Sequence, residues 1–219
     1  MSGFVDPSHV TVLAGGVGAA RFLRGLIAAI DPDRVTAVVN TGDDTELHGL
    51  AISPDIDTIV YTLAGAIDPE RGWGLAGESW QAMAALERYG PSRPAGSAAG
   101  ATWFRLGDRD LATHITRTAR LRNGGRLTDV CRALQASLGV AATILPMTDD
   151  HVRTEVRVDE GWIEFQDYFV ARRQEPEVRD IRFRGVDKAH ASNEARDALT
   201  HASLVVIAPS NPLVSINPI

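Results

Sequence analysis

A dense group of acidic side chains follows a short apolar run near residue 38. The segment VVNTGDDTELHGLAISPDIDT, residues 38–58, carries five carboxylates and one imidazole, those of Asp43, Asp44, Glu46, Asp55, Asp57 and His48. Such a run is often only a solvated loop. Carboxylates are also the ligands that Mg²⁺ prefers, and a cation between them relieves their repulsion. The segment predicts either a solvated loop or a magnesium site at Asp43 and Asp44, with His48 as a hydrogen-bonding loop residue.

A glycine-rich turn, AGGVGAAR at residues 14–21, is a second candidate site. Gly15, Gly16 and Gly18 allow a sharp turn and a close approach of the backbone to a ligand. A helix that begins there would point its N–H groups at an anion. Arg21 stands where a dinucleotide fingerprint has its third glycine, and no Gly-Lys-Ser/Thr of a P-loop follows. The turn predicts a phosphate site, with simple strand-to-helix packing as the alternative.

Three further segments combine short polar side chains with strand ends or turns. They are FRLGDRDLATH at 104–114, LPMTDD at 145–150 and PSNPLVSINP at 209–218. Alternating charges in the first favour a solvated turn, although an arginine fixed by such pairs also suits anion recognition. The last contains Ser210, Asn211 and Pro212, which suit a rigid loop whose donors face a phosphate or a base. A plain turn is the alternative for the second and third segments.

Apolar periodicity predicts the elements that position these residues. HVTVLAGGVGAARFLRGLIAAI, residues 9–30, has the pattern of a strand, a tight turn and a helix, and RVTAVV follows as a second buried strand. This order predicts an α/β fold with a doubly wound, mostly parallel, Rossmann-like sheet. A helical insertion and a small β-hairpin turning at residues 159–161 complete it. Because the carboxyl ends of parallel strands meet at one edge, the glycine turn should face the acidic segment.

The chain of 219 residues is expected to form a single α/β catalytic domain over residues 1–219, with residues 91–101 as an exposed loop. The final apolar strand, LVVIAPS, runs into a Ser-Asn-Pro loop near the last residue. A covering helix usually follows such a strand. We therefore expect that the full protein has a C-terminal segment beyond residue 219.

The composition excludes several classes of protein. A net charge of -6 with no basic stretch argues against nucleic-acid binding, and no apolar run approaches the ~20 residues of a membrane span. Cys131 is the only cysteine, which excludes an internal disulfide and fits a cytoplasmic protein. Lys188 is the only lysine among 22 basic residues, so a cationic ligand to phosphate is expected to be a guanidinium.

Seven segments resemble, in their order and spacing, those of the 2-phospho-L-lactate transferase family, called phosphoenolpyruvate transferase in mycobacteria. They are GGVGAARFL, VVNTGDD, SPDIDT, RLGDRDLATH, LPMTDD, FQDYFV and PSNPLVSI. The resemblance implies an enzyme of coenzyme F420 biosynthesis that uses Mg²⁺. Its acceptor would be the deazaflavin Fo. Its donor would be a guanosine diphosphate carrying lactate or enolpyruvate on the outer phosphate, and GMP would leave.

The resemblance also implies roles for single residues. Asp57 and Arg105 match the pair that binds Fo, and Asp57 and Asp44 are the candidate catalytic carboxylates. The three glycines of the turn and Ser210, Asn211 and Pro212 match the guanosine-phosphate site, with Asp43 and Asp44 as the metal ligands. Two positions depart from the family pattern, because Arg21 replaces a frequent lysine and Asn217 replaces a usual glycine.

A related family of regulatory proteins offers the alternative function. Its members share the glycine turn and the Ser-Asn-Pro segment but bind nucleotide-sugars without known turnover. The Asp57 and Arg105 pair separates the two, since a binding-only relative needs no Fo site. A homodimer is the default expectation for the oligomeric state.

Overall fold

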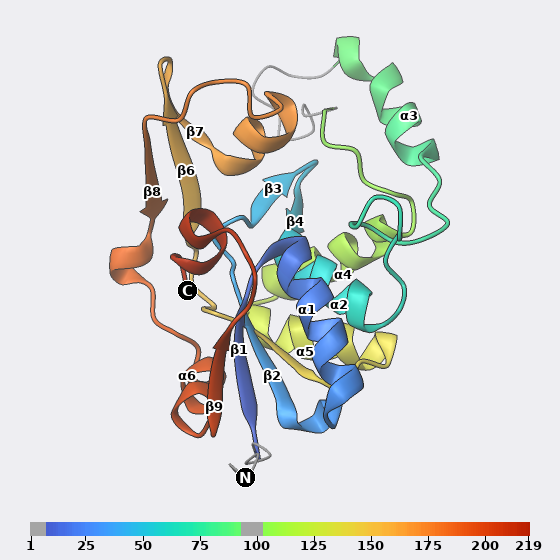
Figure 1. The fold of residues 1–219 in the computed structure, drawn as a ribbon. Helices are drawn as coiled ribbons and strands as arrows, with labels where there is room; N and C mark the ends of the chain where they lie inside the picture. Colours follow the sequence, from blue (N-terminus) through green and yellow to red (C-terminus); the bar gives the residue numbers. More distant parts are fainter. Residues whose placement is uncertain (1–7, 93–102) are drawn as a thin grey trace.

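The computed structural model describes residues 8–92 and 103–219, and it is built around a parallel four-stranded sheet (Figure 1). The strand order is β5-β2-β1-β9, and every neighbouring pair is parallel. The strands are β1 (Val10–Ala14), β2 (Val35–Val39), β5 (Thr143–Pro146) and β9 (Leu204–Ile207). The predicted α/β class with a mostly parallel sheet is confirmed.

Helices cover both faces of this sheet. Alternate side chains of β1 and β2 point into a large apolar core beneath helices α1 (Gly16–Ala29), α2 (Pro54–Leu63) and α5 (Leu127–Leu138). The intervening residues Leu13 and Val38 join a second core with Ala195 of α6 (Asn193–Thr200) on the other face. Strands buried on both faces show the continuous apolar pattern from which they were predicted.

Two small antiparallel sheets stand beyond the carboxyl edge of the main sheet (Figure 1). One is a hairpin of β3 (Thr45–Leu47) and β4 (Leu50–Ile52), which lies inside the acidic segment. The other has the order β7-β6-β8 and consists of β6 (Arg153–Val158), β7 (Gly161–Glu164) and β8 (Asp180–Arg184). Its β6–β7 pair turns at residues 159–160, which confirms the predicted hairpin.

Between β4 and β5 lies the predicted helical insertion, with α2, α5, α3 (Gln81–Arg88) and α4 (Asp110–Arg122). Its charged segment 104–114 proves to be a set of helix caps. Asp108 accepts hydrogen bonds from the backbone N–H groups of Gln81 and Ala82 at the start of α3. Asp149 of LPMTDD likewise accepts from the N–H of Thr128 at the start of α5. These carboxylates therefore satisfy helix termini.

The predicted exposed loop at 91–101 falls largely outside the described residues, since the description resumes at Trp103. Strand β9 is an outer strand of the main sheet and exposes the apolar residues Leu204, Val205 and Ile207. Short turns include 3₁₀ segments (Pro32–Arg34, Gly90–Ser92 and Val186–Lys188) and π-helical turns η4 (Asp167–Ala171) and η6 (Pro212–Ile216). Among the described residues, no helix has the length and apolar character of a membrane span.

Candidate functional site

The buried side chain of Asn40, directly after β2, joins three segments that are distant in the sequence. Its Nδ2 donates to Asp55 Oδ2 at 3.0 Å and to the carbonyl of Val214 at 3.3 Å. Its Oδ1 accepts from the backbone N–H of Gly42 at 2.8 Å. Asn40 thus fixes the end of β2 to the start of α2 and to the C-terminal loop, and it sets the course of the chain that leads to Asp43.

The glycine turn and the Ser-Asn-Pro loop lie against each other, as their assignment to one site requires. Ser210 Oγ donates to the carbonyl of Gly15 at 2.7 Å. A Cβ on Gly15 would lie 2.8 Å from Ser215 Cβ, and a Cβ on Gly18 would collide with the carbonyl of Pro209. The glycines are therefore required by packing against this loop. Packing, the predicted alternative to a phosphate site, is thus sufficient to explain the glycines at positions 15 and 18.

The N-terminus of α1 already faces a negative charge. Asp55 accepts a hydrogen bond from the backbone of Gly16, and it lies within 4 Å of the space in front of both Gly15 and Gly16. A carboxylate is a favourable neighbour for a helix N-terminus. An incoming phosphate at this position would have to displace Asp55 or share the N–H groups with it.

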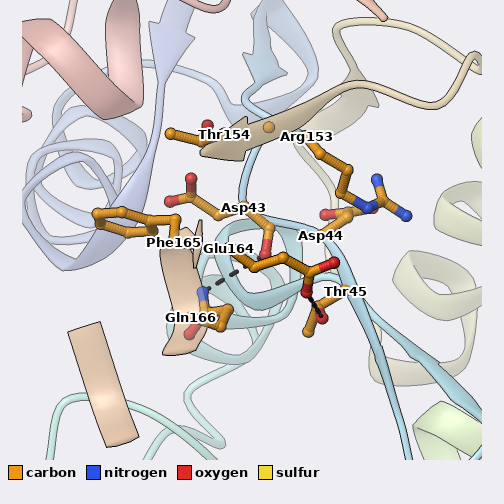
Figure 2. Close-up of a pocket in the computed structure, with 9 residues that line it drawn as sticks. Asp43, Asp44, Thr45, Arg153, Thr154, Glu164, Phe165 and Gln166 are labelled. Carbon is orange, nitrogen blue, oxygen red and sulfur yellow. Dashed lines mark hydrogen bonds between the residues drawn. The ribbon is translucent and has the colours of Figure 1, made fainter. Parts of the chain in front are cut away.

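A small pocket opens where the β7-β6-β8 sheet faces the end of β2 (Figure 2). From the β2 side it is lined by residues 42–45, which include Asp43 and Asp44. From the small sheet it is lined by Arg153 and Thr154 of β6 and by residues 164–166 at the end of β7. Thr45 Oγ1 donates to Glu164 Oε2 at 3.3 Å and joins the two walls. Carboxylates therefore line the pocket on both sides.

Burial disfavours the ionised form of three carboxyl groups near the end of β2, those of Asp43, Asp44 and Asp55. Burial, aided by the charge of Asp55, raises the pKa of Asp43 well above its usual range. Burial raises the pKa of Asp44 to about 7, although the charge of Arg153 and a hydrogen bond from Ser53 oppose the shift. Burial also raises the pKa of Asp55 to about 6. Raised carboxyl pKa values that cluster in one region of a protein are typical of functional sites.

The residues of the pocket fit a divalent cation. Oδ1 of Asp43, Oδ1 of Asp44 and Oγ1 of Thr154 are all buried and lack a hydrogen bond of normal geometry, although the Thr154 hydroxyl lies near enough to Asp43 to lower the pKa of that carboxyl group. Buried oxygens without good partners are costly, and a hard cation accepts both carboxylate and hydroxyl oxygens as ligands. Within 8–92 and 103–219, however, no three acidic, His or Cys side chains gather as a complete metal site. Mg²⁺ often binds with only one or two carboxylates because substrate phosphates supply further ligands.

Asp57, which is predicted to bind the acceptor substrate Fo, has a buried partner within the protein. Both terminal nitrogens of Arg117, on α4, bind its two carboxylate oxygens, and both side chains are almost fully buried. His114 lies beside the pair, 3.8 Å from Asp57 Oδ2. On its other side it contacts Asp110 at 3.2 Å, and Asp110 accepts a 2.6 Å hydrogen bond from Tyr61. Asp57 therefore belongs to a buried polar network between α2 and α4.

Arg105, the second residue matched to the Fo site, is exposed and lies over the ring of Trp80. Its guanidinium carbon is 5.4 Å from the ring centroid, and that of Arg71 is 4.9 Å from the same ring. Such contacts fix the plane of a guanidinium. Among the described residues Arg105 makes no hydrogen bond or ion pair with Asp57. The structure places Asp57 in the helical core and Arg105 on an aromatic surface.

The remaining polar residues of the acidic segment belong to the β3–β4 hairpin. His48 adopts a left-handed conformation at its turn, with φ of 55°, and its Nε2 lies 3.4 Å from the carbonyl oxygen of Phe104. It is a hydrogen-bonding loop residue, as predicted. Glu46 is exposed and lies 3.9 Å from Arg122.

The family follows from comparison with known proteins. Residues 10–219 match the family model described as 2-phospho-L-lactate transferase CofD. The chain belongs to the 2-phospho-L-lactate transferase family. The phosphoenolpyruvate transferase of Mycobacterium tuberculosis is 44% identical over 229 residues, which cover 96% of this chain and 67% of the relative. That of Kitasatospora aureofaciens is 42% identical over 216 residues, covering 96% and 65%.

Solved structures of similar shape support the fold. A crystal structure of a UPF0052 family member from Bacillus halodurans superposes with a TM-score of 0.61 at 16% identity. The superposition covers 96% of this chain and 62% of the Bacillus protein. This chain therefore spans about two thirds of the length of the proteins that it matches. At this identity the likeness concerns the fold alone.

Three residues of the site had no signal in the sequence. Asn40 belongs to the VVNTGDD segment, but nothing in that segment indicates its three hydrogen bonds. Arg117 lies 60 positions from Asp57 on a helix whose other charged residues are mostly exposed. Arg153 begins a strand of the small sheet, and only the packing of that sheet brings it to the pocket.

Proposed function

We propose that this protein transfers a phospholactyl or phosphoenolpyruvyl group from a guanosine diphosphate-linked donor to Fo and releases GMP, in the cytoplasm and as a step of coenzyme F420 biosynthesis. The observation that carries the proposal is the family match over residues 10–219, together with the polar pocket at the carboxyl edge of the sheet. That edge is where open α/β sheets bind nucleotides and their phosphates.

In the proposed reaction, the terminal ribityl hydroxyl of Fo attacks the outer phosphorus of the donor. A new P–O bond forms, and the bond from that phosphorus to the oxygen bridging the two phosphates breaks. GMP leaves with the bridging oxygen, and the hydroxyl proton passes to a carboxylate and then to water. Such a reaction depends mainly on positioning and on neutralising the diphosphate charge.

Asp43 and Asp44 are the residues that would hold Mg²⁺, because their unpartnered oxygens border the pocket. When bound there, the ion would neutralise negative charge on the diphosphate. Ser210, Asn211 and Pro212, with the glycine turn, would hold the guanosine part beside it. Rearrangement of Asp55 at Gly16 would open the N–H groups of α1 to a phosphate.

The proton acceptor is one of the two predicted carboxylates. Asp44 borders the pocket, whereas both oxygens of Asp57 contact Arg117. This geometry favours Asp44 for direct contact with the substrate. Asp57 would instead hold α4 in position against α2 through Arg117. Arg105, on its aromatic surface, is the proposed contact for the deazaflavin ring.

Titration of Fo, followed by its fluorescence, tests the acceptor part of this proposal. We expect saturable binding that Arg105→Ala weakens and that the exposed control Arg88→Ala, on α3, leaves unchanged. A protein that binds nucleotide-sugars but shows no saturable binding of Fo would instead have the alternative, regulatory function.

A further inference from the structure

Arg153 enters the pocket from the wall opposite the aspartates. It is the first residue of β6, and its side chain extends over the pocket toward Asp44 (Figure 2). Burial raises the pKa of Asp44, and the positive charge of Arg153 is the largest influence that lowers it. The polar pocket therefore has two carboxylates on the β2 side and a guanidinium on the β6 side.

The guanidinium of Arg153 makes few hydrogen bonds with the rest of the protein. Among the described residues, its one hydrogen bond runs from Nη1 to the carbonyl of the preceding residue, Val152, at 2.8 Å. On the neighbouring strand, Arg182 and Arg184 both pair with Glu155, at 2.6 and 2.9 Å. Arg153 makes no comparable ion pair with any residue of the described ranges. Since a guanidinium carries five N–H donors, most of those of Arg153 remain for a ligand.

The pocket's chemistry narrows the ligand class. A free anion would be attracted by Arg153 but repelled by Glu164, and also by Asp43 and Asp44 in their ionised forms, all of which line the same space. A phosphate that carries a divalent cation satisfies both walls, because the cation meets the carboxylates while other phosphate oxygens face the guanidinium. The planar fork of arginine matches two such oxygens.

We propose that Arg153 binds the outer, transferred phosphate of the donor through two parallel hydrogen bonds. This assignment rests on the proposed function and adds a residue that contacts the reacting group. It also gives the small β7-β6-β8 sheet a role, since that sheet carries the guanidinium to the edge of the parallel sheet. The buried hydroxyl of Thr154, the next residue, lies on the same wall.

Binding of GDP and GMP in the presence of Mg²⁺ tests this assignment, because the two nucleotides differ by the outer phosphate alone. For Arg153→Gln we expect the Kd of GDP to rise about 10- to 100-fold, as for the loss of charge-assisted hydrogen bonds, while that of GMP stays unchanged. Arg153→Lys should recover part of the loss. Arg157→Gln, an exposed position farther along β6, is the matched control.

Several outcomes would overturn the assignment. They are an equal loss of GDP and GMP affinity, an unchanged affinity for both, and a wild-type protein that does not prefer GDP to GMP. If only the lactyl- or enolpyruvyl-substituted donor is weakened, Arg153 binds the carboxylate of the three-carbon group and the phosphate assignment is wrong. A wild-type protein that never modifies Fo, yet prefers GDP in an Arg153-dependent way, would defeat only the proposed function.

Discussion

The guanidinium of Arg117 binds both carboxylate oxygens of Asp57 inside the contact between α4 and α2. The pair joins two helices, and its members are 60 positions apart in the chain. Because the relative exposure of each side chain is below 10%, neither charge can be solvated when its partner is lost. The pair therefore gives Asp57 a structural importance that is separate from any contact with a substrate.

Asp57→Asn is expected to lower the free energy of unfolding by about 3 kcal/mol, because it leaves the Arg117 charge buried and unpaired. Urea unfolding at pH 7 measures this change. Arg122→Gln, on the exposed side of the same helix, is the control and should change stability by less than about 0.5 kcal/mol. If Asp57→Asn unfolds like the wild type but loses transfer activity, Asp57 acts on substrate and the structural interpretation is wrong.

Asp44→Asn is expected to have the opposite effect on stability. The folded protein raises the pKa of Asp44 to about 7, so ionisation opposes folding. The stability is fully present below the unfolded pKa near 4 and is lost as pH rises through 7. Without divalent ions at pH 8, Asp44→Asn should raise the free energy of unfolding by about 1–3 kcal/mol while reducing transfer, and the gain should shrink by pH 5. A loss of stability at pH 8 would contradict this.

Mg²⁺ is expected to raise the Tm of the wild-type protein at pH 8, because the ion binds the folded pocket and not the unfolded chain. The increase should be absent from the double variant Asp43→Asn/Asp44→Asn. Glu46→Gln removes a neighbouring but exposed carboxylate and should keep the full increase. Equal increases in the double variant and the wild type would place the ion elsewhere.

Two glycines of α1 are expected to respond in opposite ways to the same substitution. Gly18→Ala places a Cβ against the carbonyl of Pro209, so it should cost about 1–3 kcal/mol and weaken nucleotide binding by moving the Ser210 loop. Gly25→Ala meets no atom within 4 Å and should stabilise the helix by roughly 0.5–1 kcal/mol. Thermal unfolding of the two variants compares them directly. Equal behaviour would mean that the loop does not hold the glycine turn.

Local patterns predicted much of the fold. Continuous apolar runs gave the parallel strands, and helical spacing of Leu23 and its neighbours gave α1. The β3–β4 hairpin escaped prediction because its strands are three residues long and the surrounding carboxylates dominate the composition. Asp43, Asp44 and the glycine turn were placed correctly at one sheet edge, since the βαβ topology alone determines it. Arg117 and Arg153 could not be found, because each reaches its partner only through tertiary packing.

The mass of the product formed from Fo tests the central claim most directly. The purified protein is incubated with Fo, Mg²⁺ and either the lactyl or the enolpyruvyl guanosine diphosphate, and the products are analysed by mass spectrometry. We predict Fo carrying the phosphorylated three-carbon group of one donor, with one GMP released per product, and loss of this product in Asp44→Asn. Unmodified Fo with both donors, under conditions in which Fo and GDP bind, would contradict the proposed transfer.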